Sequence, residues 1–288
     1  MQKLVIGCGY LGGRVARLWR AAGDGVAALT RSAENARSFA AEGIEPIVGD
    51  IARPETLASL PDADAVLYAV PPDRAADAAP RDLPLKGLAN VLDRLAGRAA
   101  RLVFVSSVSV YGQHAGEWVA EDSPTEPVRE NGRLCLAAER LVRERFADRD
   151  GGGAIVLRLA GIYGPGRLLR RVEEIRSAAP IAGDAEGWLN LVHVDDAAAA
   201  VVAAEARAPA GSTWLVCDDR PVRRREYYAQ LAALLGAPPP EFAGEPSSRT
   251  GGLNKRCSNR RLRAELGVAL RYPTIAEGLA HAIADDQR

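Results

Sequence analysis

The stretch Gly7-Cys8-Gly9-Tyr10-Leu11-Gly12 ends a short apolar run that begins at Lys3, and a helix-like pattern follows from residue 11 to residue 22. Glycines at this spacing allow a tight turn and let backbone approach a pyrophosphate at the start of the helix. The placement therefore predicts a dinucleotide-binding turn; the alternative is a glycine-rich turn without a ligand. Its predicted cofactor contacts are Gly7, Gly9, Tyr10, Leu11 and Gly12.

Outward from this turn, short apolar runs alternate with helical patterns. The runs cover residues 25–30, 44–48, 63–70, 102–107 and 154–160, and the helical patterns cover 33–41, 83–96 and 134–146. Such alternation is typical of βαβ units in a parallel sheet. We expect an α/β fold: a Rossmann-type, doubly wound parallel sheet over residues 1–160.

The rhythm changes after Gly161. Short strands are predicted at 188–192 and 213–217, with helices near 195–206, 224–235, 259–265 and 274–285. Residues 161–288 are expected to form a smaller α/β substrate-binding part, with exchange of strands or helices between the two parts.

Composition excludes several function classes. The 288 residues hold 37 basic and 37 acidic side chains, and only three of the basic ones are lysines. A net charge of zero argues against a nucleic-acid partner, because binding to a polyanion needs a basic excess. No 18-residue apolar run and no cleavable leader pattern are present, which predicts a cytoplasmic protein without membrane attachment. Four scattered cysteines fit free thiols in a reducing compartment, and no metal-binding spacing occurs.

The second predicted strand ends Leu29-Thr30-Arg31-Ser32, without the carboxylate that usually accepts the ribose hydroxyls of NAD. A guanidinium beside a hydroxyl suits a 2′-phosphate, so Arg31 and Ser32 favour NADP over NAD. The alternative is that Arg31 is an ordinary exposed arginine. Asp50 and Ile51 after the third strand and Val70 after the fourth complete the predicted cofactor side, although Asp50 is equally suited to capping the turn toward Pro54.

Further motifs follow in a specific order. They are Ser106-Ser107 with Val110-Tyr111-Gly112, Arg158 with 163–167 (YGPGR), 193–196 (HVDD), and 254–259 (NKRCSN) with 265–267 (ELG). With the glycine turn and the Gly49-Asp50 pair, they make the chain resemble the extended short-chain dehydrogenase/reductase family, the NAD-dependent epimerases and dehydratases. The resemblance implies a small-molecule substrate, a sugar or nucleotide sugar, and a monomer or homodimer.

The resemblance also implies a catalytic Ser107 and a tyrosine with a lysine four residues later. That spacing puts both groups on one helix face, where the ammonium lowers the tyrosine pKa. Aligning Glu139 with a glutamate common in the family puts Asn131 and Cys135 at those two positions, and neither can do that chemistry. None of the seven tyrosines has a lysine four residues on.

Replacements for the missing pair are Tyr111, Tyr163, His114 and Asn131, each of which also has a simple packing or solvent-exposed interpretation. We expect the catalytic set to be Ser107, Tyr111 and Asn131. By resemblance the substrate side is lined by Tyr163, Arg167, Asn190 and His193. Asp195 and Asp196 are expected to cap the following helix, and Glu139 to be solvated or paired along its own helix.

The glycine turn is shorter than the usual TGxxGxxG of the extended family, and this departure suggests an atypical subgroup similar to the bacterial YeeZ-like proteins. The sequence predicts an NAD(P)-binding, epimerase/dehydratase-like oxidoreductase with a non-standard active site. The alternative from another class is a non-catalytic NAD(P)-binding sensor or regulatory protein.

Overall fold

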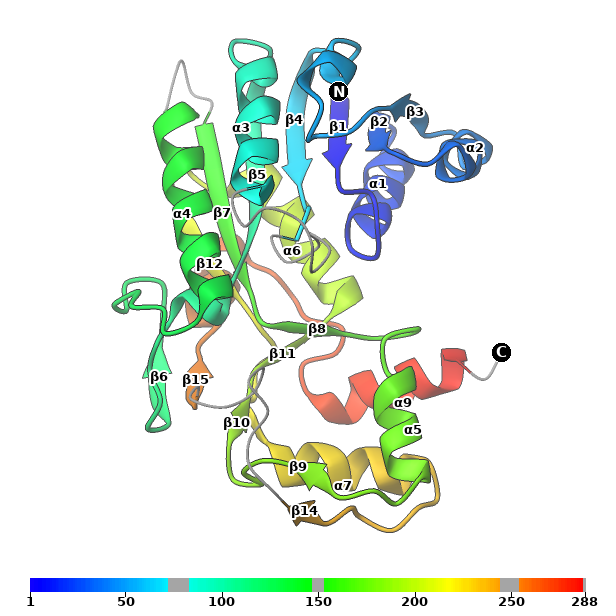
Figure 1. Ribbon diagram of the computed structural model, residues 1–288, viewed down its shortest axis with the longest axis vertical. Coiled ribbons are helices and arrows are strands. Elements are labelled where there is room, and N and C mark those ends of the chain that lie inside the picture. Colours follow the sequence, from blue (N-terminus) through cyan, green and yellow to red (C-terminus); the bar gives the residue numbers. More distant parts are fainter. Residues whose placement is uncertain (72–82, 147–152, 244–253, 287–288) are drawn as a thin grey trace. The chain divides into compact units, whose positions relative to one another are not determined.

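The apolar runs of the sequence form one seven-stranded sheet in the computed structural model, which describes residues 1–71, 83–146, 153–243 and 254–286 (Figure 1). The strand order is β12-β7-β5-β4-β1-β2-β3. The strands are β1 (Gln2–Ile6), β2 (Gly25–Thr30), β3 (Glu45–Val48), β4 (Ala63–Tyr68), β5 (Ala99–Ser107), β7 (Gly153–Leu159) and β12 (Thr213–Val216).

Strand β1 lies where the order of the sheet reverses. It pairs in parallel with β2 and with β4, so that Ile6 is in register with Leu29 on one side and Tyr68 on the other. The carboxyl ends of the three strands therefore meet at one edge. A reversal of this kind opens a crevice in which doubly wound folds bind ligands. The predicted Rossmann-type α/β fold is confirmed.

Helices cover both faces of the sheet. Figure 1 shows α3 (Leu83–Leu95) and α4 (Glu130–Arg145) in front of the strands, and α1 (Gly12–Ala21) and α6 (Val194–Arg207) behind them. Helix α2 (Ala33–Ala41) follows β2, and the short 3-10 helices η1 (Pro54–Leu57) and η2 (Val108–Val110) follow β3 and β5. Burial is nearly complete between the layers, where Ile6, Val66 and Phe104 are at most 4% exposed.

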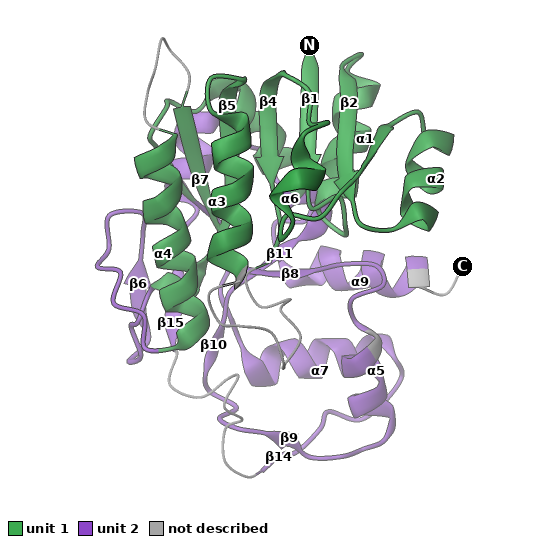
Figure 2. Cartoon of the chain, turned by 45° about the horizontal axis from the view of Figure 1, so that its top comes forward, with its two compact units in different colours: residues 1–110, 129–158, 198–214 green, residues 111–128, 159–197, 215–288 purple. Residues whose placement is uncertain are grey.

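Two compact units are interleaved along the chain (Figure 2). The first holds residues 1–110, 129–158 and 198–214, and the second holds residues 111–128, 159–197 and 215–288. The boundary expected at residue 160 falls close to the end of a first-unit segment at Arg158. Residues 198–214 return to the first unit.

The second unit contains short paired strands and helices. The strand pairs are β6 (Glu117–Val119) with β15 (Lys255–Cys257), β8 (Gly161–Tyr163) with β11 (Leu191–His193), β9 (Ile181–Ala182) with β14 (Phe242–Ala243), and β10 (Trp188–Leu189) with β13 (Val222–Arg223). The helices are α5 (Leu169–Arg176), α7 (Arg224–Leu234), α8 (Arg260–Leu266) and α9 (Ile275–Asp286). Its core is built around Tyr163, Tyr227, Tyr228 and Leu279.

The single strand expected at 188–192 is wrong, because Asn190 divides it. Residues before Asn190 pair antiparallel with β13, and residues after it pair in parallel with β8. The Asn190 carbonyl accepts a hydrogen bond from the Gly161 backbone N–H at 3.0 Å. The chain thus changes partner strand at this one residue.

Within the described residues, the helices are all too short or too polar to cross a bilayer.

Candidate functional site

The glycine turn of the first unit is packed too tightly for larger residues at two positions. Gly7 has φ +95°, and a Cβ there would lie 2.7 Å from the Ala69 carbonyl carbon at the end of β4. A Cβ on Gly12 would lie 2.3 Å from the Gly7 carbonyl oxygen. These two glycines are required by the fold itself, since real Cβ atoms do not approach backbone so closely.

Gly9 is different, because the protein's own packing does not need it. It is exposed, its φ is not positive, and a Cβ on it would meet no atom within 4 Å. Helix α1 then begins without a side-chain cap and without an acidic residue in its first turn. The positive end of the helix dipole and a backbone without a side chain at Gly9 favour an approaching pyrophosphate, so the turn has properties that suit a dinucleotide.

Tyr10 and Leu11 complete this turn. Leu11 is buried, and the Tyr10 carbonyl accepts a hydrogen bond from Arg14 Nη1 at 2.9 Å. The Arg14 guanidinium also lies over the Tyr10 ring, 4.4 Å from its centroid. This contact holds a positive charge beside the first turn of α1, where it would favour a bound anion.

The end of β2 carries the two residues predicted to choose the cofactor. Arg31 is exposed and forms no hydrogen bond or ion pair with another described residue. Ser32 is the N-cap of α2, where its hydroxyl accepts the Asn35 backbone N–H at 3.3 Å. The guanidinium of Arg31 is therefore available to a ligand, and Ser32 fixes the backbone beside it.

Asp50, Ile51 and Val70 lie after the neighbouring strands. Asp50 Oδ1 accepts the Ala52 backbone N–H at 3.0 Å, so this carboxylate does stabilise its own turn. Ile51 packs so closely on α3 that a Cβ on Gly87 would lie 2.9 Å from its side chain. Val70 is half-buried against the core. Their contacts with a cofactor remain predictions.

A buried charge network lies beneath the end of β5. Glu139 on α4 is fully buried and accepts hydrogen bonds from Ser106 Oγ at 2.6 Å and from the Arg158 guanidinium at 3.0 and 2.8 Å. Arg143 adds a weaker contact at 3.3 Å. The expectation that Glu139 is solvated is wrong, because its side chain is fully buried. The expected pairing along its own helix occurs with Arg143, and Glu139 also joins α4 to β5 and β7.

Ser107 follows this network directly. Its Oγ accepts the Ser109 backbone N–H at 3.1 Å, which leaves the hydroxyl proton to point elsewhere. On α4, Asn131 is exposed, whereas Cys135 is 4% exposed and accepts a hydrogen bond from Ser109 Oγ at 3.8 Å. The positions expected for the tyrosine and the lysine thus differ, because one side chain faces solvent and the other is buried.

Two tyrosines predicted near the reaction belong to the second unit. Tyr111 is fully buried, and its backbone carbonyl accepts a hydrogen bond from Lys255 Nζ at 2.9 Å. The Tyr163 hydroxyl donates weakly to the Thr274 carbonyl at 3.4 Å and rests on Gly278, where any Cβ would overlap it. Burial and the nearby Asp218 raise the pKa of Tyr163, which makes its phenol a weaker acid.

Arg167 and Asn190 were predicted on the substrate side. Arg167 is exposed between β8 and α5. Asn190 uses its amide to hold β15, donating to the Lys255 carbonyl at 2.9 Å and accepting the Cys257 backbone N–H at 2.6 Å. The structure thus gives Asn190 a structural role, and contact of either residue with a substrate remains a prediction.

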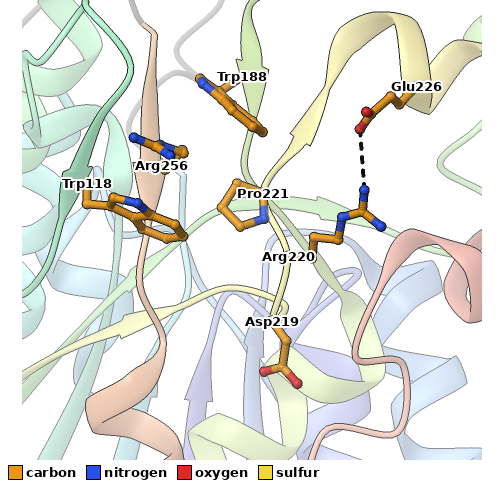
Figure 3. A pocket seen from close by; sticks show the side chains of 7 residues that line it. All are labelled: Trp118, Trp188, Asp219, Arg220, Pro221, Glu226 and Arg256. Atoms are coloured by element: carbon orange, nitrogen blue, oxygen red, sulfur yellow. Dashed lines mark ion pairs between the residues drawn. The ribbon is translucent and has the colours of Figure 1, made fainter.

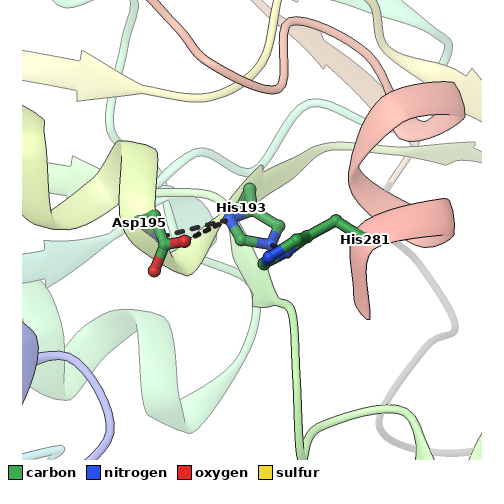
Figure 4. Close-up of side chains that lie close together, drawn as sticks. All are labelled: His193, Asp195 and His281. Atoms are coloured by element: carbon green, nitrogen blue, oxygen red, sulfur yellow. Dashed lines mark hydrogen bonds and ion pairs between the residues drawn. The ribbon is translucent and has the colours of Figure 1, made fainter. Parts of the chain in front are cut away.

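His193 is the centre of a ring cluster in the second unit (Figure 4). It is fully buried, with Tyr272 3.9 Å away between ring centroids. Its Nδ1 accepts the Asp195 backbone N–H at 3.2 Å, so in the neutral ring Nε2 carries the proton and donates it to His281 Nδ1, also at 3.2 Å.

His193, Asp195 and His281 also lie close enough to suggest a metal site. Both nitrogens of His193 are already engaged, however, and Asp195 and His281 lie on opposite sides of its ring (Figure 4). The three groups therefore do not converge on one ion as tetrahedral or octahedral coordination requires.

Asp196 does not cap helix α6 as expected. Its two carboxylate oxygens accept the backbone N–H groups of Arg271 and Tyr272 at 2.7 and 2.9 Å. The carboxylate therefore fixes the segment that leads into α9.

Sequence reasoning missed Asp218, which follows β12. It is 2% exposed, and neither carboxylate oxygen has a hydrogen-bond partner among the described residues. Burial, reinforced by the carboxylates of Asp219 and Asp196, raises the pKa of Asp218 to about 8. The only signal in the sequence is a pair of aspartates directly after a buried strand.

Comparisons with known proteins show what this chain is similar to. The family model described as "NAD dependent epimerase/dehydratase family" matches residues 4–217. Protein YeeZ of Escherichia coli K12 is 31% identical to this chain, in an alignment that covers 93% of this chain and 95% of YeeZ. A 3-diazoavenalumate denitrifying reductase from a Streptomyces species is 28% identical, over 97% of this chain and 99% of its own. The solved structure of a conserved protein of unknown function from Silicibacter pomeroyi is 29% identical, with a TM-score of 0.81 over 100% of this chain and 99% of that one.

Proposed function

Because the chain belongs to the NAD-dependent epimerase/dehydratase family, we propose that it is an NAD(P)-dependent oxidoreductase that acts on a carbonyl or alcohol carbon of a small molecule. The family points to a sugar or nucleotide sugar as the substrate. The observation that carries the proposal is Gly9, whose missing side chain serves no packing purpose and leaves open the backbone that a pyrophosphate would approach.

The nicotinamide cofactor, when bound, supplies or accepts the hydride. The chain's own residues would bind the cofactor and orient the substrate. The turn at Gly9 and the start of α1 hold the pyrophosphate, and Ser107 donates its free hydroxyl proton to the substrate oxygen as charge develops there. Arg167, which is exposed, would contact the substrate, with Tyr163, Asn190 and His193 supporting that side.

The proton in this proposal does not come from a tyrosine with a lowered pKa. Burial raises the pKa of Tyr163, and Tyr111 is fully buried. Asn131 binds a substrate oxygen without transferring a proton. Because the Tyr111 phenol is fully buried, water delivers the proton. The reaction is therefore expected to be slower than in an enzyme with the tyrosine–lysine pair.

Ser107→Ala tests the proposed catalysis. Oxidation of NADPH and NADH is followed with a panel of keto-sugars, nucleotide sugars and aromatic ketones. Losing one hydrogen-bond donor to a developing oxyanion is expected to lower kcat by about 10²–10³-fold, with the cofactor Kd unchanged. Ser109→Ala is the matched control, because the hydrogen bond to Ser107 comes from the backbone N–H of Ser109, which this substitution keeps. A Ser107→Ala enzyme with full activity would remove Ser107 from the mechanism.

A non-catalytic sensor is the second candidate, and one observation favours it. An exposed asparagine and a buried cysteine stand at the positions expected for the catalytic tyrosine and lysine. The same panel separates the two functions. Two results together would support the sensor. The cofactor would bind tightly without turnover of any panel substrate, and its affinity would be unaffected by those substrates.

Arg31→Ala tests the cofactor preference. The substitution is expected to raise the Kd of NADPH about tenfold to a hundredfold, because a charge-assisted contact with the 2′-phosphate is lost. The Kd of NADH should stay the same, and calorimetry measures both. Arg37→Ala, which changes an exposed arginine on helix α2 shortly after Arg31, is the control. An unchanged Kd of NADPH would contradict the proposed preference for NADP.

A further inference from the structure

A cavity of about 250 Å³ lies within the second unit and has no role in the proposed reaction. We call it the tryptophan pocket (Figure 3). It is lined by Trp118, Trp188, Asp219, Arg220, Pro221, Glu226 and Arg256. None of these residues is among those proposed to bind the cofactor or the substrate.

Four side chains alternate in a stack at this pocket. The Arg223 guanidinium lies 3.8 Å from the Trp188 ring centroid, and the Arg256 guanidinium lies 5.4 Å from Trp188 and 4.9 Å from Trp118. Figure 3 shows Arg256 between the two indoles. Such cation–π contacts hold guanidinium groups flat and fix their N–H edges before any ligand arrives.

One end of the stack is open. Trp118 is 55% exposed, which is unusual for so large an apolar ring. The contact with Arg256 covers only part of this indole, so the exposed remainder of the ring is available to another planar group in the pocket. Pro221 adds a second apolar wall to the pocket.

The charges of the pocket favour an anion. Of the two acidic lining residues, Asp219 is held by Arg263 at 2.6 Å and by Asn259 at 2.7 Å, and Glu226 pairs with Arg220 at 3.9 Å. Arg256 has no carboxylate partner among the described residues.

The Arg256 guanidinium is also held in one orientation by a hydrogen bond. Its Nε donates to the Gly116 carbonyl at 2.8 Å, and its two terminal nitrogens form no hydrogen bond with another described residue. A planar fork with free N–H groups matches the two oxygens of a carboxylate or phosphate.

We propose that the tryptophan pocket binds a flat aromatic ring that carries a carboxylate or phosphate group. The ring packs against the exposed edge of Trp118 and against Pro221, inside the pocket that Arg256 also lines, so that its anionic oxygens accept hydrogen bonds from the terminal nitrogens of Arg256. The volume accommodates a ring of one or two cycles with its anionic group. The proposal does not depend on the proposed oxidoreductase function, since all the groups involved belong to the second unit.

The test uses benzoate and phenyl phosphate as probes, which distinguish a carboxylate from a phosphate ligand. Cyclohexanecarboxylate has the charge of benzoate without its ring face, and benzyl alcohol has an aromatic ring without the charge. Two of the four tryptophans, Trp19 and Trp214, are at most 1% exposed, so NMR of the indole N–H groups separates the pocket from the core. Benzoate or phenyl phosphate should shift the signals of Trp118 and Trp188 only.

Variants locate the site. Trp118→Leu and Arg256→Gln should each weaken probe binding about tenfold or more, and Arg256→Lys should recover only part of the loss because it keeps the charge without the fork. Arg261→Gln, at an exposed pair with Glu265, is the control. Circular dichroism checks the fold of each variant.

Four outcomes would overturn the proposal. They are equal binding of cyclohexanecarboxylate and benzoate, unchanged affinity in Trp118→Leu, displacement of the probe by NADPH, and no shift of either pocket tryptophan at millimolar probe.

Discussion

Replacing Glu139 with alanine is expected to lower the free energy of unfolding by about 3–5 kcal/mol, because it breaks a buried ion pair from one side. Arg158, 5% exposed, would lose the carboxylate that binds it through two oxygens. Ser106 would lose the acceptor of a 2.6 Å hydrogen bond. Each of these buried polar groups then bears a desolvation cost without the interaction that offsets it.

Urea unfolding followed by circular dichroism measures this loss. Glu139→Gln should lower the free energy of unfolding by less, because its amide oxygen can still accept the hydrogen bond from Ser106 although the charge is gone. Glu144→Ala, at an exposed position on the same helix, is the control and should change the free energy by less than about 0.5 kcal/mol. A Glu139→Ala protein as stable as the control would show that the network contributes nothing to stability.

The Glu139 network also bears on function. Ser106 is held by Glu139, and the next residue is Ser107, the proposed hydrogen-bond donor to the substrate. Because the network ties β5 to α4 and β7, it fixes the strand end from which Ser107 projects. Loss of Glu139 should therefore reduce activity even at temperatures where the variant remains folded.

The sheet was predictable from sequence because its signals are local. Buried strands, the glycines at 7 and 12, and helix patterns each occupy a few neighbouring residues, and the parallel crossover allows few arrangements of them. The helix predicted at 224–235 ends one residue later than α7, and the helix predicted at 259–265 begins and ends one residue earlier than α8. For Gly9 the sequence predicted the type of turn, and the structure showed that the space beside it is empty.

The failures share one physical cause: the partner lies far away in the sequence. Glu139 looks like a surface residue of a helix until Arg158 is placed against it from β7. Asp196 looks like a helix cap, but its partners are backbone groups more than seventy residues later. Asn190 sits in an apolar run that reads as one strand, and only its bonds to β15 reveal why the run breaks. No local pattern encodes such contacts.

Asp218→Asn is expected to make the protein more stable than the wild type as the pH rises. Burial and the carboxylates of Asp219 and Asp196 raise the pKa of Asp218 to about 8, from an ordinary value of 3.8. Between these two pH values the native state keeps a proton that the unfolded chain has released. Rising pH therefore favours unfolding by up to about 1.4 kcal/mol per pH unit, and the effect is complete above pH 8.

The amide of asparagine removes this titration, because it is neutral at every pH. The difference in free energy of unfolding between Asp218→Asn and the wild type should therefore grow from pH 5 to pH 8 and then level off. Urea unfolding at pH 5, 6, 7, 8 and 9 measures it, and taking the difference cancels the groups that titrate alike in both proteins. Asp285→Asn, at an exposed position on α9, should give a difference that stays flat. A flat difference for Asp218→Asn as well would mean that its carboxylate is ionised at neutral pH in the native state, and that burial is offset by a counter-charge or hydrogen bond.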